Sequence, residues 1–122
     1  MTLARLRALC MSMPGATEQI QWGKDLVFKV GGKMFCVANT DPVGSEIATS
    51  FKCDPDTFAE LCEREGIKPA PYMARAQWVG LERFDTLPDR ELKPLIARAY
   101  ELIKAKLPKK AQAALGSSRR KA

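Results

Sequence analysis

Residues 22–37 read W-G-K-D-L-V-F-K-V-G-G-K-M-F-C-V, and this stretch decides the fold. Two apolar runs flank Gly31-Gly32, and glycine tolerates the positive φ angles that a two-residue type I′ hairpin turn requires. The stretch therefore predicts two paired antiparallel strands. Alternation makes one face apolar, to be covered by helices, and the other only partly polar. The apolar face should carry Leu26, Phe28, Val30, Met34, Cys36 and Ala38. The opposite face should carry Val27, Lys29, Lys33, Phe35 and Val37.

Length and composition describe one globular domain. The chain has 122 residues, of which 46% are hydrophobic, and this suffices for a core without disulfide or metal staples. It lacks a run of about 18 apolar residues, so no membrane span is expected. Arg5 and Arg7 interrupt the apolar N-terminal stretch, which we interpret as a helix rather than a signal peptide. A cytoplasmic location is expected.

Periodicity along the rest of the chain predicts the order α-β-β-β-α-β-β-α. Helices are expected over residues 2–13, 55–65 and 87–107, and strands over 26–30, 34–38, 46–53, from residue 67, and 77–82. Residues 19–22 add at most a short extended piece. Pro94 requires the last helix to begin near Arg90 or to kink. The fold class is a two-layer α+β domain over residues 1–108, with three helices on an antiparallel sheet of about five strands. Residues 109–122 are expected to form a basic tail that is frayed or disordered by Gly116.

The net charge of +6 belongs to the C-terminus. Residues 1–103 hold 13 Lys and Arg against 14 Asp and Glu, whereas residues 104–122 hold seven basic residues and no acid. Such a segment attracts polyanions non-specifically, although many basic ends are merely solvated. The outer face of the second predicted helix is acidic, through Asp56, Glu60, Glu63 and Glu65.

Residues suited to catalysis or metal binding are scarce. The chain has no His, so Ser-His and Cys-His pairs are excluded, and no ordinary general base is present near neutral pH. Four cysteines, Cys10, Cys36, Cys53 and Cys62, form no C-x-x-C pair. We expect reduced thiols, no metal, no cofactor and no enzymatic activity.

Cations and aromatic residues gather on or beside the predicted strands, a combination that suits base stacking with phosphate contact. The candidates are Trp22, Lys24, Lys29, Lys33, Lys52, Tyr72, Arg75 and Trp78. The tail adds Lys109, Lys110, Arg119, Arg120 and Lys121. Alternatively, the tryptophans pack in or around the core and the lysines only keep the strands soluble.

Four segments and the last helix resemble the MmcQ/YjbR family of small bacterial proteins. They are P-G-A-T-E (14–18) with Trp22-Gly23, L-V-F-K-V-G-G-K-M-F-C-V (26–37), S-F-K-C-D-P (50–55) and G-I-K-P-A-P-Y-M-A-R-A-Q-W-V (66–79). The resemblance covers residues 3–107. It implies a two-layer α+β fold related to CyaY-like and secretion-chaperone-like folds. It also implies DNA binding, because family members look like the double-wing domain of a phage transcription factor, which is an argument from fold. The resemblance brings no catalytic motif to carry over.

The functional hypothesis is therefore a non-enzymatic DNA-binding protein that uses the sheet face, the basic tail or both. The alternative is an adaptor whose exposed sheet face takes a protein or a small molecule. A monomer or weak homodimer is expected in either case.

Overall fold

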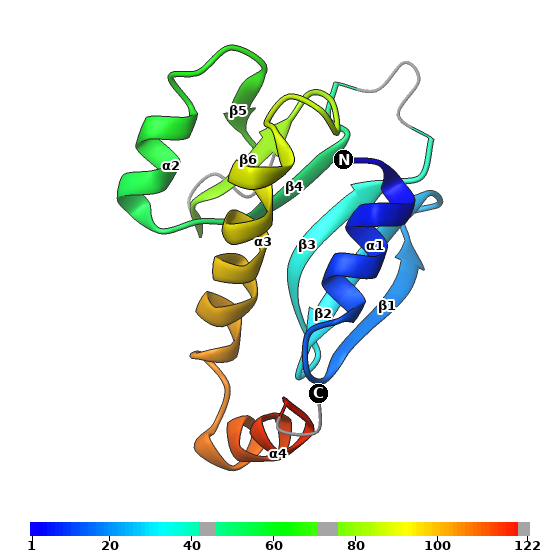
Figure 1. Ribbon diagram of the computed structural model, residues 1–122, viewed down its shortest axis with the longest axis vertical. Coiled ribbons are helices and arrows are strands. Elements are labelled where there is room, and N and C mark those ends of the chain that lie inside the picture. Colours follow the sequence, from blue (N-terminus) through cyan, green and yellow to red (C-terminus); the bar gives the residue numbers. More distant parts are fainter. Residues whose placement is uncertain (42–45, 71–75, 120–122) are drawn as a thin grey trace.

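The computed structural model describes residues 1–41, 46–70 and 76–119, and side chains as far as residue 115 (Figure 1). Six strands of these residues form one antiparallel sheet in the order β1-β2-β3-β4-β6-β5. They are β1 (Ala16–Gln21), β2 (Asp25–Val30), β3 (Lys33–Asn39), β4 (Thr49–Lys52), β5 (Ile67–Pro69) and β6 (Trp78–Leu81). The helices are α1 (Leu3–Met11), α2 (Pro55–Leu61), α3 (Asp89–Lys104) and α4 (Lys109–Arg119). The predicted α+β fold is confirmed. It gains the strand β1, which is longer than expected, and the helix α4.

The Gly31-Gly32 hairpin is confirmed. Val30 pairs with Lys33 across the turn, and the φ angles of Gly31 and Gly32 are 58° and 81°. Both angles lie in the left-handed region that glycine enters without a Cβ clash. The two glycines thus set the reversal of direction between β2 and β3 locally.

A β-bulge in β3 reverses two of the predicted orientations. Phe28 pairs with Cys36 but Lys29 pairs with Met34, so Phe35 is the extra residue. Its ring enters the core and meets Tyr100 edge to face, with centroids 5.5 Å apart and planes at 89°. Met34 lies on the other face against Val27 and its neighbours. The prediction that Met34 faces the helices and Phe35 faces away was therefore wrong, because an extra residue breaks the alternation of a strand.

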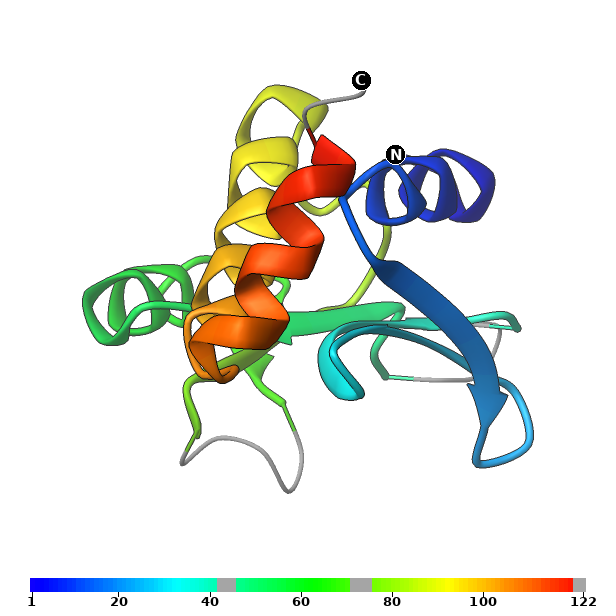
Figure 2. The same ribbon diagram turned by 90° about the horizontal axis from the view of Figure 1, so that it is seen from below.

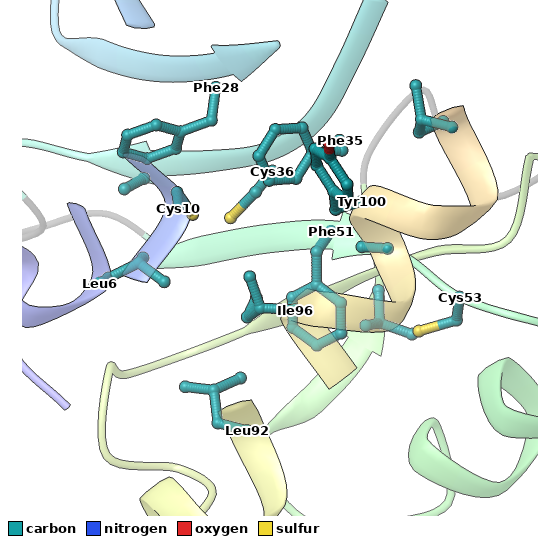
Figure 3. Close-up of a cluster of buried hydrophobic side chains, with 14 of the residues drawn as sticks. Leu6, Cys10, Phe28, Phe35, Cys36, Phe51, Cys53, Leu92, Ile96 and Tyr100 are labelled. Atoms are coloured by element: carbon teal, nitrogen blue, oxygen red, sulfur yellow. The ribbon is translucent and has the colours of Figure 1, made fainter. Parts of the chain in front are cut away.

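The helices α1, α3 and α4 lie on one face of the twisted sheet (Figure 2). The main core fills the space between them, and part of it is drawn in Figure 3. A smaller cluster occupies the opposite, helix-free face, where Val27, Val37 and Trp78 are at most 8% exposed. The centre of that face is therefore closed to solvent.

Two features of the helices bear on the predictions made from the sequence. The helix α3 begins at Asp89 and keeps Pro94 inside, five residues after its start. The segment after Pro108 was expected to fray, but it forms the helix α4, and Ala111 and Leu115 pack against the core. A weak apolar stripe did not predict this helix because its stability comes from packing against the rest of the domain. Residues 120–122 lie outside the described part.

Candidate nucleic-acid interface

The structure separates the predicted binding residues into two groups at opposite ends of the sheet. Trp22 and Lys24 lie in the turn between β1 and β2, whereas Lys33 begins β3 at the far end of β2. The six residues of β2 span about 17 Å at roughly 3.3–3.4 Å per residue. Tyr72 and Arg75 lie outside the described residues. The predicted sheet face of cations and aromatic residues is therefore not one continuous surface but two separate ones.

The candidates in the middle of the helix-free face are already engaged. The Trp78 indole is 4% exposed and lies opposite Lys52 in the strand register. The Lys52 side chain is also buried, and its Nζ donates a hydrogen bond to the Ala76 carbonyl. Nζ of Lys29 donates to Oε1 of Gln19 at 3.1 Å. Because Trp78 is enclosed, it cannot stack on a base without rearrangement.

A lysine-rich surface forms where α3 ends. A Cβ on Gly31 would lie only 2.6 Å from Cδ1 of Leu107, so Leu107 sits directly on the β2–β3 turn. This contact brings the end of α3 and the start of α4 beside Lys33, at the lower end of the molecule in Figure 1. We call this surface the basic end. It comprises Lys33, Lys104, Lys106, Lys109 and Lys110.

The charges of the basic end are not neutralised by acids. None of its lysines forms an ion pair with an acid in the described part of the chain. Lys52 is buried beside this surface, and its pKa is lowered, mainly because burial disfavours its charge and also because Lys106 repels it, while Asp54 offsets part of the shift. Uncompensated cations that repel one another favour the binding of an anion.

The arginines behave differently, because most of them already hold a carboxylate. The guanidinium groups of Arg7, Arg64 and Arg98 each donate two hydrogen bonds to one acid, to Glu18, Glu91 and Asp54 respectively. These bonds lower the pKa of the three carboxyl groups. The side chain of Asp54, which directly precedes α2, makes no cap hydrogen bond to that helix and is held by Arg98 of α3 instead. These three arginines are therefore already engaged by carboxylates, unlike the lysines of the basic end.

The cysteines are buried thiols. Cys10, Cys36 and Cys53 are at most 2% exposed, and the sulfur atoms of Cys10 and Cys36 point toward each other in the core (Figure 3). A hydrogen bond to Cys36 and burial raise the pKa of Cys10, and burial raises the pKa of Cys53 to about 12. Among the described residues, no group of three Cys, Asp or Glu side chains could hold a metal ion.

These environments predict selective thiol labelling. Iodoacetamide at neutral pH should modify the native protein at one site, Cys62, because this thiol is the only partly exposed one of the four. The other three thiols should react only after denaturation, since burial keeps the reagent away from them, and for Cys10 and Cys53 a raised pKa also removes the reactive thiolate. Mass spectrometry of the peptides would count the sites. Rapid modification of Cys10 or Cys36 in the folded protein would contradict this core.

In the ranges that the structure describes, no helix is both long and apolar enough to cross a bilayer.

The fold and its basic end define a small two-layer α+β protein with an open antiparallel sheet and a lysine-rich surface. The family model YjbR matches residues 11–102, and the chain belongs to the YjbR family. It is also similar to the crystal structure of the Deinococcus radiodurans protein DR2400, which has the family-model domain DUF419. The two are 27% identical over 94% of this chain and 88% of that chain, with a TM-score of 0.81. No curated protein matches the chain. The family that the sequence motifs predicted is thus confirmed.

Proposed function

We propose that this protein binds DNA through phosphate contacts at its basic end. The observation that carries the proposal is the set of lysines from three separate elements that meet there without acidic partners. Lys33 comes from the β2–β3 hairpin, Lys104 from the end of α3, and Lys109 and Lys110 from α4, while Lys106 lies in the connection between the two helices. Non-specific attraction to DNA depends on the number of phosphates that such cations neutralise.

The contacts should be to the sugar-phosphate backbone rather than to base edges. Lysine ammonium groups act as point charges, without the planar geometry with which arginine reads guanine. Lys109 and Lys110 are exposed in the first turn of α4, and Lys106 is exposed just before it. We therefore expect binding that depends strongly on salt and little on sequence.

The acidic surface of the domain lies elsewhere and would orient the protein. Asp56 and Glu60 are exposed on α2, and Glu63 and Glu65 follow it. These carboxylates repel a polyanion, whereas the lysines attract it. A domain that is nearly neutral over residues 1–103 can therefore still approach DNA by one end.

Reversing two of the charges of the basic end tests the proposal. The double variant Lys109→Glu, Lys110→Glu should lose most of its affinity for a labelled duplex at low salt. Its slope of log affinity against log salt should flatten by about 1.8, since each phosphate contact adds about −0.9. Fluorescence anisotropy at several salt concentrations measures both quantities.

The matched control reverses the same number of charges on the same helical layer. Arg90 and Lys93 are exposed at the start of α3, far from the basic end, so Arg90→Glu, Lys93→Glu should leave binding nearly unchanged. Equal losses in the two double variants would show that only net charge matters. Unchanged binding in the Lys109 and Lys110 variant would exclude α4 as the DNA contact.

The alternative function, an adaptor that uses the sheet face, gains less support. The centre of the helix-free face is closed to solvent at Val27, Val37 and Trp78. A ligand at that place would have to displace packed side chains, and this costs free energy that the basic end does not require.

A further inference from the structure

The turn between β1 and β2 exposes a tryptophan at an energetic cost. Trp22 is 64% exposed, the largest fraction among the exposed large hydrophobic residues of the described chain, and its φ angle is 53°. A left-handed conformation costs an L-residue roughly 1–2 kcal/mol, and glycine or asparagine would adopt it more easily. Neither core packing nor turn geometry therefore accounts for an indole at this position.

The turn holds Trp22 in a defined place. The backbone carbonyl of Lys24 accepts hydrogen bonds from both N and Oγ1 of Thr40, at 2.9 and 2.7 Å. These bonds fasten the turn to the end of β3. The indole thus projects from a fixed support, which lowers the entropic cost of using it in binding.

Two hydrogen-bond acceptors without donors lie beside the turn. Gln21 and Asp25 are opposite each other in the β1–β2 register, so their side chains emerge on the same face. Oε1 of Gln21 is buried and has no hydrogen-bond partner among the described residues. Asp25 forms no ion pair with a base in the described chain.

The carboxyl group of Asp25 is also partly desolvated. Burial raises its pKa, and the charge of the neighbouring Lys24 offsets this only in part. A cationic donor placed between Asp25 and Gln21 would therefore satisfy both side chains at once. Because Oε1 of Gln21 is out of contact with solvent, its flexible side chain must rotate to admit that donor.

β1 adds the means to hold an extended segment. It is the outermost strand of the sheet on its side, so one edge of its backbone is not used by another strand of the described chain. Ile20 is 54% exposed on this strand, two residues before Trp22. An extended peptide can pair with such an edge and place alternate side chains against it.

We propose that β1 and the Trp22 turn form a docking site for an extended segment of a partner protein that presents an arginine. The arginine guanidinium stacks on Trp22 and donates hydrogen bonds to Asp25 and Gln21, while the backbone of the segment pairs with β1. Charge complementarity selects this occupant: the unmet groups are acceptors, and one of them is a carboxylate. The site lies at the opposite end of the sheet from the basic end, so it can be occupied while DNA is bound.

A pair of isosteric peptides tests the proposal. The probes are Ac-Thr-Val-Arg-Val-Thr-NH2 and the same peptide with citrulline in place of arginine, which keeps the shape and loses the charge. The arginine peptide should bind about tenfold more tightly, the ratio expected for one cation–π contact or one charged hydrogen bond. Isothermal titration calorimetry measures both affinities in the unaltered protein and in variants without Trp22, and the fluorescence of the exposed Trp22 reports the site in the unaltered protein.

Two variants locate the contact without disturbing the fold. Trp22→Asn removes the ring and tolerates the positive φ angle, and Asp25→Asn removes the charge at constant shape. Each should reduce the tenfold preference for arginine to near unity. Equal binding of the two peptides by the unaltered protein, or a preference that survives both substitutions, would overturn the proposal, as would the absence of binding at millimolar peptide.

A further variant separates this proposal from DNA binding. Lys109→Glu, Lys110→Glu should keep the full preference for the arginine peptide, while Trp22→Asn should keep the DNA affinity. Loss of peptide binding in the lysine variant would show that the two surfaces are one, and would contradict the site at Trp22.

Discussion

Replacing Tyr100 by alanine should lower the free energy of unfolding by about 3–5 kcal/mol, the usual cost of deleting a large buried aromatic side chain. Tyr100 is 1% exposed in α3 and joins two distant parts of the core. Its ring packs edge to face on Phe35 from β3. Its hydroxyl donates to the carbonyl of Pro14, just after α1. Urea unfolding followed by circular dichroism measures the loss.

Tyr100→Phe divides this effect into its parts. It keeps the ring contact with Phe35 and leaves the Pro14 carbonyl without its donor, so the expected loss is about 1–3 kcal/mol. A phenylalanine variant as unstable as the alanine variant would place the stabilisation in the hydrogen bond. An alanine variant that loses less than about 1 kcal/mol would show that Tyr100 does not occupy the core.

Replacing Gly31 by alanine should have the second-largest effect, a loss of about 2–5 kcal/mol in the free energy of unfolding. One part is the left-handed conformation at φ 58°, which costs an L-residue roughly 1–2 kcal/mol. The other part is steric, because the new Cβ would lie 2.6 and 2.7 Å from the two Cδ atoms of Leu107. Leu107 is buried and cannot move aside freely, and overpacking typically costs about 1–3 kcal/mol.

Gly32→Ala is the matched control, one residue along the same turn. Its φ angle is 81°, but a Cβ there meets no atom within 4 Å. Gly32→Ala should lose only the conformational part of the stability. Thermal unfolding should therefore show that Gly31→Ala is clearly less stable than Gly32→Ala. Equal losses would mean that Leu107 does not press on the turn. The comparison also tests the surface proposed to bind DNA, since this contact holds the end of α3 beside Lys33.

The local pattern of the sequence was sufficient for most of the fold. The Gly31-Gly32 pair, the alternation in β2 and the proline and glycine stops placed the elements, because such signals act within a few residues. The same pattern failed at Phe35, where a bulge inserts one extra residue. The helix α4 was also missed, because its packing partners, such as Gly15 near Leu115, are distant in sequence.

The candidate site could be predicted only as a list of residue types. Lys33, Lys109 and Lys110 were among the predicted candidates, and the structure brings them to one end, whereas Lys52 is buried on the helix-free face. Lys104 and Lys106 were counted as charges but not as site residues. The charge excess after residue 103 was the signal that could have included them.

The sequence by itself determined the family, the antiparallel hairpin and the concentration of unopposed positive charge after residue 103. Tertiary structure alone decided which of those charges lie close together, because the contact of Leu107 with Gly31 places the end of α3 beside the β2–β3 turn. It also decided that Trp78 is buried while Trp22 is exposed to solvent. Both tryptophans lie in or next to strands. Only the packing of the chain around each one determines whether its ring is available to a partner, because burial depends on contacts between residues far apart in the sequence.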